Sequence, residues 1–168
     1  VFYGAVNLNF VKFAQINIGL MILLLVVMLV YFGVILLLGR LLKQKKQITY
    51  LIATGSAICG ASAIAITTPV VNADPDDVSI SLFSIFIVAM FGLFILFPFL
   101  LNLMDLTNQI YALFSGMILQ FTGFVKSATG NLSKEISSLA LLVKAARYLG
   151  LFIAIPLFAS LTKKKFHI

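Results

Sequence analysis

Long stretches without charge constrain this chain more than any other feature of its sequence. Residues 13–39, 47–73 and 78–104 each form a run of 27 residues without Asp, Glu, Lys or Arg, and 106–125 forms a run of 20. A helix needs about 20 apolar residues to cross the roughly 30 Å of hydrocarbon in a bilayer. The sequence therefore predicts an all-α, polytopic membrane protein that has the lipid bilayer as its main partner.

The predicted architecture is a single transmembrane domain over residues 1–168, with about five transmembrane helices and the end of an earlier helix at 1–10. Because the chain begins at Val1 and not at Met, we expect it to be a portion of a longer protein. In chain order, the predicted spans are 18–39, 48–71, 78–101, 110–125 and 136–161.

Basic residues cluster after the first predicted span, at Arg40, Lys43, Lys45 and Lys46, and after the last one, at 163–165. Short loops rich in Lys and Arg stay on the cytoplasmic side of a membrane. Five crossings place both clusters on that side, so the loop 40–47 and the C-terminal tail are predicted to be cytoplasmic. The remaining loops are then predicted outside at 72–77, inside at 102–109 and outside at 126–135.

Charge and composition also exclude several classes of function. The net charge of +7 lies at the ends of apolar segments, which is typical of membrane topology, so no nucleic-acid partner is expected. The one cysteine, Cys59, and the one histidine, His167, have no companion ligands in the sequence, so we expect no metal site and no cofactor. Without clustered acids, His or Cys, we do not expect an enzyme.

The middle of the second predicted span, residues 54–63, is unusually rich in small side chains. One interpretation is close packing, because Ala53, Ala57, Ala61 and Ala65 recur every four residues and form a smooth ridge for another helix. On that interpretation the chain is a membrane assembly component, and a straight, unbroken helix would favour it.

The other interpretation is a discontinuous helix. Gly55 and Gly60 permit a break, hydroxyl side chains can bond the freed backbone groups, and Pro69 cannot continue the hydrogen-bond ladder. A half-helix beginning near Ser56 would aim N–H groups with about half a positive charge at the middle of the membrane, which favours an anion. Ser56, Gly60 and Ser62 are therefore candidate binding residues.

The fourth predicted span has a second interruption, with Gln120 at membrane depth between Gly116 and Gly123. Ordinary small-residue packing explains the glycines equally well, so both interpretations stay open here. If the segment is interrupted, Gln120 is expected to give the site a neutral polar contact.

The last span must carry two cations. Its charge-free part, 148–162, has only 15 residues and reaches about 22 Å, too short to cross. A full span therefore includes Lys144 and Arg147, three residues apart and on one helix face. They either face a binding site, to which they supply positive charge, or extend their charged ends to water at the membrane surface.

The run 55–65, with its ICGASAI core, and the Thr68-Pro69-Val70-Val71 that follows resemble the YeiH family (UPF0324), a bacterial membrane family also called putative sulfate exporters. Phe2-Tyr3-Gly4 and the Lys144, Arg147 and Pro156 pattern are similar to the same family in the right order. The resemblance implies a central portion of a protein about twice as long, related in fold to inverted-repeat transporters with crossing broken helices, in a prokaryotic inner membrane.

The chain also departs from the family pattern. Many members have a His and an acidic residue where this chain has Leu119 and Gln120, and an Arg shortly after the glycine equivalent to Gly4.

Taken as a whole, the sequence favours a secondary transporter of a small anion, with sulfate export as the activity that the resemblance implies. A cation- or proton-coupled carrier of an organic solute and a non-transporting assembly component remain alternatives, and a homo-oligomer stays open.

Overall fold

The computed structural model describes residues 18–99 and 107–163, and this part of the chain is helical and contains no strand. The predicted helix end at 1–10 and the resemblance at Phe2-Tyr3-Gly4 fall outside the described residues. In chain order the elements are α3 (Ile18–Leu41), α4 (Lys46–Thr54), the π-helix η1 (Gly55–Cys59), α5 (Ala61–Val71), α6 (Pro75–Phe91), the π-helix η2 (Gly92–Leu96), α8 (Asn108–Ile118), α9 (Thr122–Ala128), α10 (Lys134–Ala146), the 3-10 helix η3 (Arg147–Gly150) and α11 (Leu151–Lys163).

Within the described ranges 18–99 and 107–163, three continuous helices are long and apolar enough to cross a membrane. They cover Gly19–Leu41, Pro75–Phe99 and Lys134–Ser160, with 23, 25 and 27 residues, and the last two pass through η2 and η3 without a break. The predicted spans 18–39, 78–101 and 136–161 lie at the same positions. The all-α, polytopic class predicted from the charge-free stretches is therefore confirmed.

The segment predicted as the second crossing instead turns back on itself. Lys45, just before α4, forms ion pairs with Asp74 at 2.9 Å and Asp77 at 2.7 Å, just before and within the first turn of α6. The start of α4 and the end of α5 must therefore lie at the same end of the molecule. We call α4, η1 and α5 hairpin A. The prediction that 48–71 crosses the membrane, with 72–77 on the far side from 40–47, is wrong.

The segment predicted as the fourth crossing also turns back. The Tyr111 hydroxyl, in the first turn of α8, donates a hydrogen bond to the carbonyl of Ala128 at the end of α9, at 3.1 Å. The Tyr111 ring packs edge-on against Phe97, with centroids 5.6 Å apart, so this base lies at the C-terminal end of the long helix Pro75–Phe99 that begins with α6. We call α8 and α9 hairpin B. The prediction that 110–125 crosses is wrong, and the described part of the connection, 107–109, lies opposite to 40–47.

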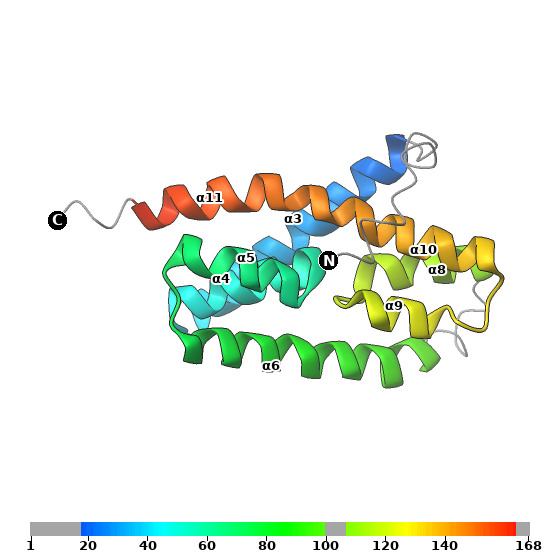
Figure 1. Cartoon of the computed structure of the whole chain (residues 1–168), viewed down its shortest axis with the longest axis horizontal. Coiled ribbons are helices and arrows are strands. Elements are labelled where there is room, and N and C mark those ends of the chain that lie inside the picture. The colour runs from blue at the N-terminus through cyan, green and yellow to red at the C-terminus, as the bar shows by residue number, and fades with distance from the viewer. Residues whose placement is uncertain (1–17, 100–106, 164–168) are drawn as a thin grey trace.

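The two hairpins therefore enter the molecule from opposite ends (Figure 1). We call the end with Lys45 end A and the end with Tyr111 end B. The α10–α11 helix runs from end B to end A, where Phe158 packs against Tyr50 with ring centroids 4.7 Å apart. Loop 40–47 and the start of the tail at Lys163 thus share an end, as their basic residues predict. This prediction holds although two predicted crossings are hairpins, because removing two crossings leaves the loop and the tail on the same side.

The order of a long helix followed by a hairpin occurs twice: α3 precedes hairpin A, and α6 precedes hairpin B with the opposite direction. An inverted repeat has this form, although the repeat itself stays a prediction. Figure 1 shows the hairpins placed one after the other along α6 and the α10–α11 helix. Their closed ends, the tips, therefore meet in the middle of the molecule.

Ion pairs hold the two ends of hairpin A together at its base. Asp77, which is buried, accepts hydrogen bonds from the Lys45 ammonium and from the backbone N–H of Asp74, at 3.2 Å, and completes a capping box at the start of α6. Hydrogen bonds to Asp77 and Asp74 raise the pKa of Lys45 above its usual value. The ion pairs therefore persist at neutral pH. Their contribution to stability is lost as pH rises through the raised pKa of Lys45, or as pH falls through the pKa of Asp77, which the same contact lowers.

Candidate functional site

Hairpin A turns at Gly60. The backbone widens into the π-helix η1, where the Gly60 N–H bonds to the Gly55 carbonyl at 2.8 Å, and Gly60 then adopts φ 70° and ψ −129°. Only glycine adopts this region without strain. A side chain at Gly60 would also meet the ring of Phe121 at 3.1 Å and the Gln120 carbonyl at 3.2 Å. The sequence therefore places its smallest residue where the two tips touch.

Hairpin B turns through three residues instead of one. α8 ends at Ile118, Leu119 and Phe121 are extended with ψ of 131° and 134°, and α9 begins at Thr122. Gln120, between them, is only 4% exposed. Leu119 is buried beside Phe97 and Tyr111 in the hydrophobic core of end B, which fixes the turn in place.

Lys144 lies at the meeting of the two tips. It projects from the last turn of α10, is 1% exposed, and donates to the carbonyl of Ile58 at 3.0 Å and to that of Leu119 at 2.8 Å. We call the first half of each hairpin, which runs toward the tip, its inbound arm: α4 with η1 in hairpin A, and α8 in hairpin B. Ile58 belongs to the first of these arms, and Leu119 ends the second. One ammonium group therefore joins two hairpins that approach from opposite ends.

Arg147 joins the same two arms more extensively. It is also 1% exposed, and its guanidinium stands 5.9 Å from the centroid of the Tyr31 ring, within cation–π range. Its hydrogen bonds run to the carbonyls of Ser56 at 2.6 Å, Ala57 at 2.9 Å, Gly116 at 3.2 Å, Met117 at 2.7 Å and Leu119 at 3.3 Å.

The tip junction, which we define as residues 56–60, 116–121, Lys144 and Arg147, carries a net positive charge. Each inbound arm brings the negative end of its dipole, about half a charge, against the two cationic side chains, which leaves about +1. No described carboxylate lies within ion-pair distance of either cation. Because the desolvation of each ion costs several kcal/mol, a buried pair of cations without a counter-anion calls for a functional explanation.

The first turn of α5 adds to this polarity. Its N-cap is Gly60, which supplies no side chain to the free N–H groups, and Ser62 is half-buried in the same turn. Gln120 forms no side-chain hydrogen bond in the part of the chain that the structure describes. The arrangement thus keeps donors available beside a positive centre.

The structure brings together most of the predicted site residues, with changes in how they act. Ser56, Gly60, Gln120, Lys144 and Arg147 all lie in the tip junction. The half-helix begins at Ala61 and not near Ser56, whose carbonyl faces Arg147.

Two further expectations are corrected. Pro69 does not interrupt α5, which continues to Val71, and Gly55 opens η1 without ending the helix, so the break is at Gly60 alone. The alternative in which Lys144 and Arg147 extend to water is wrong, because both are 1% exposed.

No sequence pattern points to the backbone carbonyls that bind the cations, since every residue has the same carbonyl group. A partial signal was Gly116: a side chain there would come within 2.5 Å of the Ala140 carbonyl, so glycine is needed for α8 to pack on α10. The tip hydrogen bond between Thr122 and Tyr148, at 3.1 Å, was also missed.

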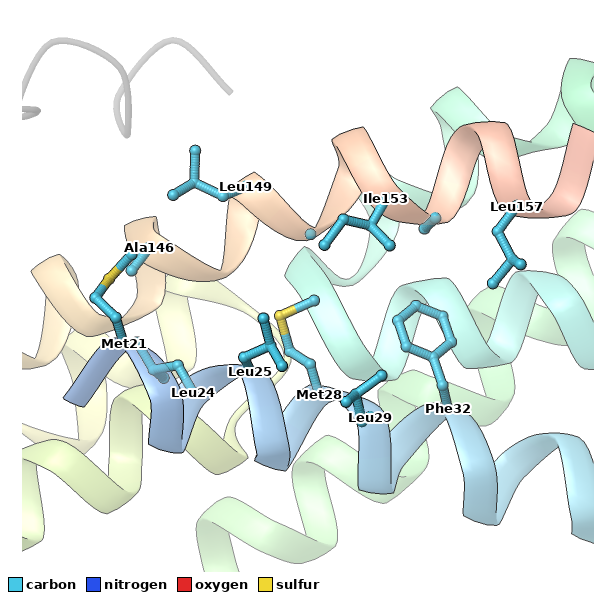
Figure 2. Close-up of a pocket in the computed structure, with 12 residues that line it drawn as sticks. Met21, Leu24, Leu25, Met28, Leu29, Phe32, Ala146, Leu149, Ile153 and Leu157 are labelled. Carbon is cyan, nitrogen blue, oxygen red and sulfur yellow. The ribbon is translucent and has the colours of Figure 1, made fainter. Parts of the chain in front are cut away.

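A separate groove lies between α3 and the α10–α11 helix. Figure 2 shows Met28 and Phe32 of α3 pointing toward the helix that carries Ile153 and Leu157. The groove has a volume of about 150 Å³, and all twelve residues that line it are apolar. It therefore has no group that would bind a charged solute, unlike the tip junction.

The three membrane-length helices and two re-entrant hairpins of the described residues define the chain as a polytopic helical membrane protein. The family described as Conserved hypothetical protein 698 matches residues 1–167, and the chain belongs to this family.

Curated relatives carry the name UPF0324 membrane protein, which confirms the resemblance found in the sequence. Bd1437 of Bdellovibrio bacteriovorus is 34% identical over 113 residues, 67% of this chain and 34% of that protein. FN0533 of Fusobacterium nucleatum is 33% identical over 135 residues, 77% of this chain and 38% of that protein. A protein of Clostridium tetani is 27% identical over 159 residues, 95% of this chain and 46% of that protein.

The chain thus spans less than half the length of these curated relatives. No solved structure matches it.

Proposed function

We propose that this protein is part of a secondary transporter that carries a small inorganic or organic anion through the tip junction. The observation that supports the proposal best is the pair of buried cations, Lys144 and Arg147, with no described carboxylate to neutralise them. An anion bound at the junction would balance this charge. Sulfate is the first candidate, because the resembled family is called putative sulfate exporters.

The hairpin arrangement supports transport in a second way. A site between two tips that enter from opposite ends lies near the middle of the membrane, where transporters bind their substrates. A small displacement of either tip would open the site toward one end while the other tip keeps it closed. Loop 40–47 and the tail are proposed to face the cytoplasm, in the inner membrane of a bacterium.

A cation- or proton-coupled carrier of an organic solute has less support. Such carriers use a carboxylate at membrane depth, whereas the described long helices have acids only in their first turns, at Asp76, Asp77 and Glu135. The curated relatives are more than twice as long as the segment they share with this chain, so their remaining length leaves room for such a carboxylate.

An assembly component that relies on the alanine ridge is also less supported. The helix breaks at Gly60, so Ala53 and Ala57 are buried in one arm while Ala61 and Ala65 are exposed on the other. We propose a carrier in preference to an enzyme on the same grounds, since the junction offers positive charge and no described acid–base pair.

Uptake into liposomes tests the proposal. The purified protein is reconstituted into liposomes, and radiolabelled sulfate, phosphate, succinate or the neutral control glucose is added to the outside solution. We expect saturable uptake of at least one anion and none of glucose. Ser62→Ala, which removes a hydroxyl beside the junction and leaves the carbonyl–cation bonds intact, is expected to raise KM for that anion.

Ser79→Ala is the matched control, because Ser79 is exposed and bonds its own helix at Pro75 far from the junction. It is expected to leave KM unchanged. Absence of anion uptake by folded protein of full family length would rule out the proposed function.

A further inference from the structure

Backbone carbonyls gather at the tip junction, and they bear on the binding of cations there as well as of anions. Six backbone carbonyls, from residues 56, 57, 58, 116, 117 and 119, accept hydrogen bonds from Lys144 and Arg147. They come from the final turns of two helical arms, where the last carbonyls have no partner in their own helix. The cluster therefore carries concentrated negative partial charge.

Carbonyls at the ends of broken membrane helices are the groups with which secondary transporters coordinate Na⁺. Here the same kind of group is saturated by two covalently attached cations. The Lys144 ammonium, at 3.0 and 2.8 Å from the Ile58 and Leu119 carbonyls, lies between the two hairpins, and Arg147 bonds both arms as well. A free metal cation at this position would meet two fixed positive charges in a buried site.

We propose that Lys144 and Arg147 take the place of a coupling cation. Joining the two hairpin tips requires positive charge, and the chain supplies it permanently. The protein therefore needs neither Na⁺ nor K⁺ to assemble its binding site. The statement about coupling rests on the proposed transport function, whereas the statement about cation binding at the carbonyls does not.

The proposal predicts a gain of cation binding when Lys144 is removed. Lys144→Ala leaves the Ile58 carbonyl without its side-chain donor, opens space beside the Leu119 carbonyl, and lowers the local charge by one. A monovalent cation entering that space restores the charge, with water completing its coordination. Lys144→Met serves as a second variant, because its similar length preserves packing while removing the charge.

Thermal unfolding measures this directly. The purified full-length protein is heated in about 100 mM NaCl, KCl, LiCl or N-methylglucamine chloride, without any substrate anion other than chloride. We expect the Tm of the unmodified protein to be the same in all four salts. For Lys144→Ala or Lys144→Met, one small cation is expected to raise Tm by about 2 °C or more over N-methylglucamine. Lys134→Ala, at the exposed start of the same helix, is the control and should show no such rise.

A Na⁺- or K⁺-specific rise in the Tm of the unmodified protein would overturn the proposal, and so would folded Lys144 variants that ignore the choice of cation. If neither variant folds, the unmodified protein decides alone: equal Tm in the four salts supports the proposal. These outcomes involve no transport, so failure of anion uptake would remove the proposed function and leave the cation result standing.

Discussion

At the scale of single residues, the junction depends on side chains that are too small or too charged for a plain membrane helix. Gly60 makes a turn that other residues resist, and Lys144 and Arg147 bind the carbonyls that the turns leave free. Each of these residues is costly alone: glycine weakens a helix, and a buried cation must lose its water. Together they compensate one another, because the cations bond the backbone groups that the breaks release.

Replacement of Gly60 tests the turn. Gly60→Ala forces a β-carbon into a backbone with φ 70° and against Phe121 and Gln120, so we expect a loss of about 1–3 kcal/mol in stability. Gly33→Ala is the control, because a β-carbon at Gly33, within α3, meets nothing within 4 Å, and it should keep or slightly raise Tm. Thermal unfolding in detergent gives both values, and equal effects would argue against the tight turn.

Replacement of Arg147 tests its bonds to the backbone. Arg147→Met removes the side-chain donor from the carbonyls of both inbound arms, and we expect a loss of at least about 3 kcal/mol or no folded protein. Arg40→Met makes the same change at the exposed end of α3 and should alter stability by less than about 0.5 kcal/mol. Comparable Tm values for the two variants would contradict the role given to Arg147.

At the scale of elements, the two hairpins are held differently. Hairpin A has an ionic base at Lys45 and lies in the largest hydrophobic cluster of the described core, among side chains of α3, α6 and α11. Hairpin B has a neutral base, the Tyr111–Ala128 hydrogen bond, and a short outbound arm of seven residues. Its firm contact is between α8 and α10, where Gly116 lies against Ala140 and Val143.

The contact of α8 with α10 sets the distance between the tip of hairpin B and Lys144. Gly116→Ala puts a β-carbon 2.5 Å from the Ala140 carbonyl and 3.0 Å from the Val143 side chain, so α8 must shift. We expect destabilisation of about 1–3 kcal/mol. Gly123→Ala, in the open first turn of α9, meets nothing within 4 Å and should be neutral. An equal, small effect of both substitutions on Tm would show that α8 is not closely packed.

At the scale of the whole molecule, the sequence predicted the helical class, the three long helices and the residues of the junction. It could not predict whether a charge-free stretch crosses the molecule or turns back on itself. The stretch 47–73 is as long and as free of charge as 78–104, yet the first turns back, whereas the second is a continuous helix as far as the structure describes it, to Phe99. The difference lies in tertiary contacts, the Lys45–Asp77 ion pair and the meeting of Gly60 with Phe121, and no local pattern encodes these.

The place of Lys144 and Arg147 within the last membrane helix was predictable, because its charge-free part is too short to cross by itself, whereas the sequence left open whether they are buried or extend to water. Their partners were not, since the partners are backbone atoms of segments that are 25 to 91 positions away. The arrangement of the chain thus depends on these distant contacts: two hairpins enter from opposite sides and meet at two buried cations.

Side-specific labelling tests that arrangement most directly. Single cysteines at the exposed positions Lys43→Cys, Asp76→Cys and Asn131→Cys are introduced after Cys59→Ala and treated, in oriented vesicles, with a reagent that cannot cross the membrane. The two re-entrant hairpins predict that Lys43→Cys and Asp76→Cys react from one side and Asn131→Cys from the other. Reaction of Asp76→Cys together with Asn131→Cys, from the side opposite to Lys43→Cys, would contradict the account and restore five simple crossings.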